Sequence, residues 1–267
     1  MKLSEKRVLG KTGLKVNPLG IASSYGAPAE AFEEAFERGC NYFVWNTFMK
    51  GRSPRMREAI RNIVKAGKRD QLIIAMHSYG HNALMNQYFI NRSLKQLGVD
   101  YIDVMLLGYY SWKPAKAVIN SALKLKEKGI VRFIGMTGHN RALFPILDKK
   151  NIFDVFHIRY NAVHRGAEND VFPHLQTENR TGIVTFTATS WGQLLDQKRM
   201  QEGETAPTST DCYRFVLSNP AVDLCLTAPK TVEQMRENLK VLELGPMNED
   251  ELTRMRKIGD YLYRKKK

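Results

Sequence analysis

The sequence contains few cysteines: Cys40, Cys212 and Cys225 are the three in 267 residues, and they share no metal-like spacing. An odd and sparse set of thiols is typical of a reduced cytoplasmic protein and argues against a disulfide framework. The N-terminus lacks the apolar core of a signal peptide, and no segment is long enough to span a bilayer. We therefore expect a cytoplasmic protein without membrane contact.

Acidic residues are scarce relative to basic ones, since 27 Asp and Glu face 41 Lys and Arg, for a formal net charge of +14. Such a positive field attracts anionic partners, although it is also the ordinary result of a solvated basic exterior. Residues 264–267 form the longest basic run, and no basic motif with interleaved aromatic residues is present. The charge therefore favours a small anionic ligand over specific nucleic-acid binding.

What the sequence does contain is a regular alternation of short apolar runs and segments with helical periodicity. This alternation predicts a parallel (β/α)8 barrel, a TIM barrel, and by itself it would also fit a doubly wound sheet. A single domain over residues 1–267 suits the length of such a barrel. The predicted strands are 20–23, 42–46, 72–77, 101–107, 131–136, 155–160, 183–186 and 222–226, after a hairpin at 7–19; the predicted helices are 29–38, one from 53, one before Gly98, 115–125, 140–149, 170–175, 212–217, 232–242 and a last one from 248.

One helix–strand junction is especially clear. Ile90, Leu94 and Leu97 recur at helical spacing, and Gly98 supplies the left-handed turn that commonly ends a helix. Residues 101–107 then form a mostly apolar run of strand length, as expected for a strand that is covered on both faces.

Five segments resemble the aldo-keto reductase family, and the resemblance covers nearly the whole chain. The resemblance implies a (β/α)8 barrel whose N-terminal hairpin closes the bottom, a C-terminal helix, an NADP(H) cofactor and a monomer by default. The segments are LGKTGLKV at 9–16, SLKQLGVDYIDV at 93–104, GIVRFIGMTGHN at 129–140, RYN at 159–161 and EQMRENL at 233–239.

The family reduces carbonyl groups with an Asp, a Tyr, a Lys and a His at the ends of strands two to four. By position, these four residues are Val44, Met49, His77 and Gly108 in this sequence. A shift of one residue does not supply the Asp or the Tyr, because no Asp, Glu or Tyr lies between Val44 and Arg57. The resemblance therefore implies the fold but not carbonyl reduction by the usual mechanism.

The family's cofactor positions are matched in part. Thr137 keeps a hydroxyl where the family has a Ser-Asn pair, Gly138 replaces the amide, and His157 takes the place of a Gln. After strand eight, N–H groups at a helix start and Lys230 would bind a phosphate, although Thr231 and Gln234 also have the spacing of a capping box, which needs no ligand. The expected cofactor residues are Thr137, His157, Asn161, Trp191, Lys230, Thr231, Gln234, Glu237 and Asn238.

Other polar and aromatic residues fall at predicted strand ends. His77 would occupy the place of the family's Lys, where an imidazole could act as an acid or base, or could simply fill the space. Arg159 would be a cation at the barrel mouth that needs an anion or an acidic partner. The expected catalytic residues are His77, Trp45 and His139, and the expected substrate residues are Tyr25, Tyr79, Tyr109 and Arg159; Tyr109 would form an aromatic wall with Tyr110 and Trp112, unless these rings anchor the loop.

Three histidines on the predicted strands three, five and six raise the question of a metal: His77, His139 and His157. No carboxylate accompanies them in the sequence, so no metal is expected. Three functions follow: an oxidoreductase-like protein with an NADP(H)-type pocket, an isomerase or lyase that uses His77, or a ligand-binding pseudoenzyme without catalysis.

Overall fold

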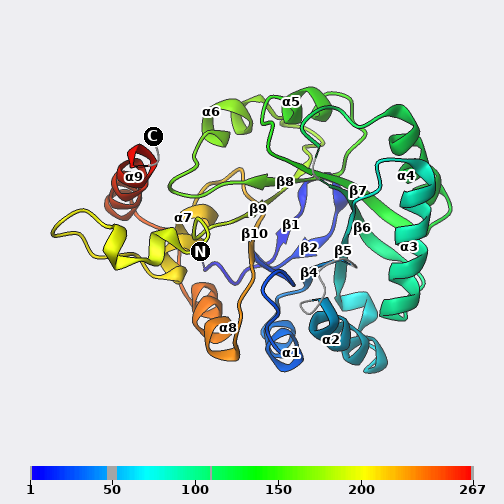
Figure 1. The fold of residues 1–267 in the computed structure, drawn as a ribbon, viewed down its shortest axis with the longest axis horizontal. Helices are drawn as coiled ribbons and strands as arrows, with labels where there is room; N and C mark the ends of the chain where they lie inside the picture. The colour runs from blue at the N-terminus through cyan, green and yellow to red at the C-terminus, as the bar shows by residue number, and fades with distance from the viewer. Residues whose placement is uncertain (1, 47–52, 109, 266–267) are drawn as a thin grey trace.

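The computed structural model describes residues 2–46, 53–108 and 110–265, and its centre is a closed barrel of parallel strands (Figure 1). Neighbouring strands follow the order β10-β3-β4-β5-β6-β7-β8-β9, and every neighbouring pair is parallel. The predicted barrel is thus confirmed, and the doubly wound alternative is wrong. The strands are β3 (Leu19–Ala22), β4 (Tyr42–Trp45), β5 (Ile73–Ser78), β6 (Ile102–Leu107), β7 (Val131–Gly138), β8 (Val155–Arg159), β9 (Gly182–Phe186) and β10 (Leu224–Thr227).

Helices surround the barrel (Figure 1). No helix among the described residues is both long and apolar enough to cross a membrane. The α-helices are α1 (Ala29–Glu37), α2 (Ser53–Lys65), α3 (Ala83–Leu97), α4 (Lys116–Glu127), α5 (Leu143–Asp148), α6 (Ala167–Asp170), α7 (Ser209–Leu217), α8 (Val232–Leu239) and the C-terminal α9 (Glu249–Arg264); short 3-10 turns are η1 (Gly10–Thr12), η2 (Arg69–Gln71), η3 (Phe172–His174), η4 (Gln193–Leu195), η5 (Gln197–Arg199) and η6 (Lys240–Glu243).

The helix predicted at 170–175 is wrong. The chain ends α6 at Asp170 and continues as the turn η3. Pro173 explains the difference, because proline has no N–H for the helical hydrogen bond and its ring clashes with the carbonyl four residues earlier.

The junction at Gly98 is confirmed. The side chain of Asn82 accepts a hydrogen bond from the N–H of Met85 and so caps the start of α3. Gly98 ends this helix with φ at 71°, and its N–H donates to the carbonyl of Leu94 at 2.8 Å. The strand β6 that follows is buried at every position.

The hairpin of β1 (Arg7–Val8) and β2 (Lys15–Val16) covers one end of the barrel. Leu9 and Val16 belong to the same buried cluster as the residues that point into the barrel. Gly10 packs so closely on β9 that a Cβ atom there would lie 2.3 Å from the nitrogen of Gly182, and its φ is +46°. Only glycine suits this contact.

The buried side chains form two layers, one inside the barrel and one between the strands and the helices. In β4, Tyr42 and Val44 belong to the inner cluster, whereas Phe43 and Trp45 belong to the outer one. This alternation follows from the two-residue period of a strand, and it decides which side chains can reach the mouth of the barrel.

A ring of polar side chains links the strands at the end of the barrel where they begin. At every second strand, a carboxylate or amide oxygen accepts a hydrogen bond from a backbone N–H in the preceding strand or, in the case of Asn41, from Asn17 just before β3. The acceptors are Asn41 before β4, Asp103 in β6, Asp154 before β8 and Asp223 before β10, and the donor–acceptor distances are 2.9, 2.9, 2.8 and 2.7 Å.

Candidate active site at the barrel mouth

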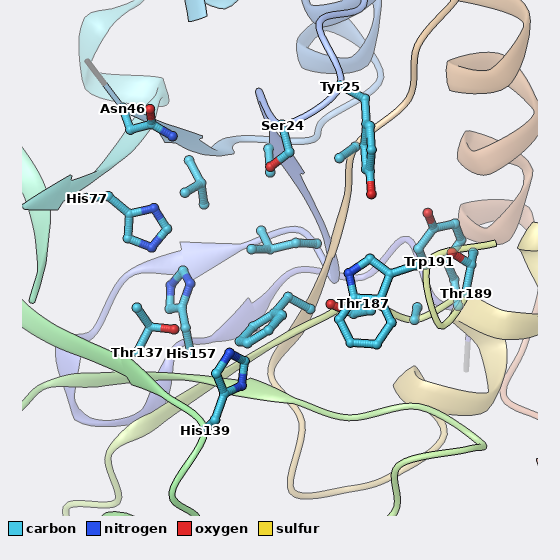
Figure 2. Close-up of a pocket in the computed structure, with 17 residues that line it drawn as sticks. Ser24, Tyr25, Asn46, His77, Thr137, His139, His157, Thr187, Thr189 and Trp191 are labelled. Atoms are coloured by element: carbon cyan, nitrogen blue, oxygen red, sulfur yellow. The ribbon is translucent and has the colours of Figure 1, made fainter. Parts of the chain in front are cut away.

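A pocket of about 380 Å³ lies where the barrel strands end. This is the end at which barrel enzymes place their chemistry. Figure 2 shows the imidazoles of His77 and His157 together with Thr137 at one end of the pocket, and the rings of Tyr25 and Trp191 at the other. The lining residues are Ala22, Ser24, Tyr25, Val44, Asn46, His77, Thr137, His139, His157, Phe186, Thr187, Ala188, Thr189, Trp191, Tyr213, Leu226 and Ala228.

Two histidines line one end of the pocket, and the buried Tyr42 lies against one of them. The rings of His77 and His157 are 6.3 Å apart between centroids, and Nε2 of His157 lies 2.9 Å from the hydroxyl of Tyr42. Burial lowers the pKa of His77 to about 4, and burial together with the neighbouring His77 lowers the pKa of His157 well below its ordinary value. Both imidazoles are therefore neutral at pH 7, so this end of the pocket carries no fixed positive charge.

Tyr42 was not among the residues expected at the site. The sequence could have indicated this position, because the two-residue period of a strand places Tyr42 on the same side of β4 as Val44. Burial raises the pKa of Tyr42, so its hydroxyl remains protonated.

Gly108 lies beside His77, where it leaves space. A Cβ atom at this position would be 3.9 Å from Cδ2 of His77, 3.9 Å from Cγ2 of Thr137 and 3.4 Å from the carbonyl oxygen of Ser78. Val44 lines the same pocket, and Met49 lies outside the described residues.

Charged side chains do not contribute to the described lining of the pocket, which contains no Asp, Glu, Lys or Arg. The hydroxyl groups of two tyrosines are present instead. Tyr213 is buried and shares a hydrogen bond of 2.8 Å with the hydroxyl of Thr227, while Tyr25 is 41% exposed and has the amine of Lys230 5.7 Å from its ring centroid.

The loop after β9 has an unusual backbone. Thr187, Ser190 and Trp191 have φ values of 67°, 50° and 57°, a region that residues other than glycine seldom adopt. The amide of Asn161 donates to the carbonyl of Thr187 at 2.8 Å, and its oxygen accepts from the N–H of Val163 at 2.9 Å. Asn161 thus holds this loop in place, although it does not itself line the pocket.

Arg159 ends β8 next to the pocket. Its guanidinium lies 5.7 Å from the ring centroid of Trp191, outside the lining proper. Burial and the positive charge of Arg141 lower the pKa of Arg159, while burial and Arg159 lower the pKa of the exposed His139. The guanidinium of Arg159 therefore places a positive charge beside this side of the pocket.

Several expected residues do not reach the pocket. Trp45 was expected at the mouth, and this is wrong: it is 1% exposed, belongs to the outer layer and donates to the carbonyl of Ser53 at 3.0 Å. The reason is the alternation along β4, which points Val44 inward. Tyr79 packs on the outer layer with its ring 5.8 Å from that of His77, and Tyr109 lies outside the described residues.

Residues 230–238, after β10, also stay outside the pocket lining. Thr231 caps α8 by accepting from the N–H of Gln234 at 3.2 Å, and the Gln234 side chain accepts from the N–H of Lys230 at 2.9 Å. Asn238 is buried and donates to the hydroxyl of Thr227 at 2.8 Å, whereas Glu237 pairs with Lys240. The hydrogen bonds of Thr231 and Gln234 are therefore those of a helix cap, which needs no ligand. Lys230 is exposed beside Tyr25.

A metal centre does not assemble here. Over the part of the chain that the structure describes, no group of three or more His, Cys, Asp or Glu residues is placed to hold a metal ion.

Comparisons with known proteins agree with this architecture. Residues 22–211 match the Aldo/keto reductase family. The chain is 23% identical to L-galactose dehydrogenase of Arabidopsis thaliana, covering 93% of this chain and 92% of that protein. It is also 23% identical to an uncharacterized oxidoreductase, YqkF, of Bacillus subtilis (strain 168), covering 92% and 94%. The holo form of the aldo-keto reductase AKR11C1 from Bacillus halodurans superposes with a TM-score of 0.81 at 18% identity over 96% of both chains, a similarity of fold.

Proposed function

The chain belongs to the aldo/keto reductase family, and from this premise we propose that its barrel mouth binds a nicotinamide dinucleotide, NADP(H) before NAD(H). The observation that supports this proposal most is the joint position of Thr137, His157 and Trp191 in one pocket of about 380 Å³. The family uses the positions of Thr137 and His157 for the carboxamide, and hydroxyl and imidazole groups can both hydrogen-bond to an amide. A bound nicotinamide would supply hydride chemistry, while these side chains would orient its ring.

We further propose that the chain lacks the proton-donating machinery of the family. The positions of the family's Asp, Lys and His are occupied by Val44, His77 and Gly108, and the described lining contains no carboxylate. The family's Lys acts through its positive charge, which makes the catalytic Tyr more acidic. His77 is a poor substitute, because its pKa of about 4 leaves it neutral at pH 7. Nucleotide binding without efficient carbonyl reduction is therefore expected.

A thermal-shift titration with NADPH, NADH and the oxidised forms tests nucleotide binding. A ligand that binds only the folded chain adds about 2.7 kcal/mol of stability at a hundredfold excess over Kd. We expect the largest rise in Tm with NADP(H), and a smaller one in Thr137→Val, which removes the hydroxyl but keeps the shape. Thr253→Val, at an exposed position of α9, is the matched control. The absence of any nucleotide-dependent shift would refute the proposal.

An assay of NADPH oxidation with a panel of aldehydes tests the second part. We expect no turnover above the background rate, and turnover at a rate ordinary for aldehyde reductases would contradict it. Two alternatives, an isomerase or lyase that uses His77 and a pseudoenzyme, then differ in the effect of His77→Gln. His77→Gln should abolish the activity of an isomerase or lyase that uses this imidazole. In a pseudoenzyme it should leave ligand binding intact.

We propose that the chain works in the cytoplasm. All three cysteines are free and buried, which suits a reducing compartment such as the cytoplasm. We propose a monomer there, following the family.

A further inference from the structure

Arg159 is a charged residue beside the pocket of the proposed ligand. Along β8 the side chains of Val155 and His157 point into the barrel, and the two-residue period places Arg159 on the same side at the end of the strand. Its partner in the neighbouring strand β9 is Phe186, which lines the pocket. The guanidinium lies 5.7 Å from the ring centroid of Trp191, another lining residue. Arg159 therefore stands at the rim of the pocket.

Among the described residues, this guanidinium has no anionic partner. Its favourable contact there is with the ring of Trp191, and no hydrogen bond or ion pair from a described residue reaches it. Arg141, whose positive charge acts on Arg159, pairs with Asp170 at 2.6 Å.

The surroundings make this unpaired charge costly. Arg159 is partly buried and experiences the positive charge of Arg141, while His139 lies close enough for its own pKa to be lowered by Arg159. A partly desolvated cation is stabilised by an anion that accepts hydrogen bonds from it, and a guanidinium matches a carboxylate or phosphate in a two-point contact.

We propose that Arg159 recognises an oxyanion, a carboxylate or a phosphate, on a small molecule that enters the barrel mouth. The proposal deepens the proposed function, since it takes the same pocket as the ligand site. The side chain of Trp191 would cover the apolar part of that ligand, while Arg159 would select for its charge.

Isothermal titration calorimetry with matched ligand pairs provides the test. The carboxylate pair is 4-carboxybenzaldehyde and its neutral analogue 4-formylbenzamide, and the phosphate pair is glyceraldehyde 3-phosphate and glyceraldehyde. Each pair is titrated into the natural chain, Arg159→Gln, Arg159→Lys and the control Arg38→Gln, without nucleotide and again with NADPH. Arg38 lies at the end of α1, where its side chain is 45% exposed and pairs with Glu34. The control therefore removes one positive charge from elsewhere on the molecule.

We expect the charged member of at least one pair to bind about tenfold more tightly than the neutral one. Arg159→Gln should weaken that member about ten- to a hundredfold, as for lost hydrogen bonds to a charged group, and leave the neutral member unchanged. Arg159→Lys should retain part of the preference for the charged member, because lysine keeps the positive charge but cannot make the two-point contact of a guanidinium. The pair that shows the effect identifies the anion as carboxylate or phosphate.

Other results overturn the assignment. Equal affinities for the charged and neutral members, or no binding of any anionic member, would do so. Equal losses of affinity in Arg38→Gln and Arg159→Gln would also do so, because they would indicate attraction by the net positive charge of the molecule alone. If Arg159→Gln weakens NADPH but not the anionic carbonyl compounds, the oxyanion is the cofactor diphosphate and the substrate assignment is wrong. If NADPH fails to bind while the anion preference persists, the proposed function fails and this inference stands.

Discussion

Gly108 and Gly138 are both small residues at the barrel mouth, but their surroundings differ. A Cβ atom at Gly108 would make contacts of 3.4 Å or more, whereas one at Gly138 would lie 2.5 Å from the carbonyl oxygen of Tyr110. Gly138 is thus required by the close approach of the backbone. Gly108 is not, because a Cβ atom beside His77 would make only ordinary van der Waals contacts.

This difference gives a prediction for two matched substitutions. Gly108→Ala should leave the free energy of unfolding unchanged or raise it by about 0.4–1 kcal/mol, because alanine restricts the unfolded chain. Gly138→Ala should be destabilising, because backbone atoms must move. Urea denaturation of both variants measures the effect. Equal destabilisation by the two substitutions would show that the space beside His77 is not available.

His77 also makes stability depend on pH. Burial lowers its pKa from 6.5 to about 4, so between these values the unfolded chain binds more protons than the folded one. The free energy of unfolding is therefore highest above pH 6.5, as far as this histidine is concerned, and decreases as the pH falls from 6.5 toward 4. A shift from 6.5 to about 4 corresponds to roughly 3 kcal/mol. The pKa of His157 is lowered as well, so it acts in the same direction.

We therefore expect the free energy of unfolding to fall between pH 6.5 and 4, and to fall less steeply in His77→Asn. Denaturant titrations at several pH values measure this slope. His174→Asn, at an exposed position of η3, is the control and should retain the natural slope. An unchanged slope in His77→Asn would show that this imidazole is not desolvated in solution.

At the scale of elements, the loop after β9 depends on one buried amide. Asn161 donates to the carbonyl of Thr187 and accepts from the N–H groups of Val163 and His164 at 2.9 and 2.8 Å. The loop needs such support, because Thr187 is β-branched and has a φ of 67°. Backbone strain of this kind persists only where neighbouring contacts enforce it, and it is frequent at ligand sites.

Asn161→Ala should therefore weaken two properties together. We expect a loss of about 1–3 kcal/mol of folding stability from the unsatisfied backbone groups. We also expect weaker nucleotide binding, since Trp191 follows Thr187 in the same loop. Denaturation and a nucleotide titration measure the two effects, with Asn169→Ala as an exposed control. Normal nucleotide affinity in a destabilised Asn161→Ala chain would separate the loop from the binding site.

The elements themselves could be predicted from the sequence, because strand runs, helical periods and stop signals such as Gly98 are local. What could not be read was which side chains reach the pocket. Trp45 is the last residue of β4, yet it faces the helices, while Tyr42, three residues earlier in the strand, lies against His157. Asn161 follows a strand end and binds backbone rather than ligand. These outcomes depend on barrel geometry, which no single segment encodes.

At the scale of the whole molecule, the barrel is joined by the four acceptors at the start of alternate strands. Asp103 is the most heavily engaged of them: it is 1% exposed and accepts from the N–H of Ile74 at 2.9 Å. It also pairs with Arg69 and Arg132, each at 2.8 Å. One carboxylate therefore connects β5, β6 and β7, so its loss should affect the closure of the barrel rather than a single strand.

We expect Asp103→Ala to lower the free energy of unfolding by about 3–5 kcal/mol, because removing one partner leaves Arg69 partly buried without its counter-charge. Asp103→Asn should cost less, since the amide oxygen can still accept from Ile74. Asp70→Ala removes an exposed carboxylate near the same end and is the control. Urea denaturation measures all three. If Asp103→Ala costs no more than the control, the backbone hydrogen bonds between parallel strands close the barrel by themselves.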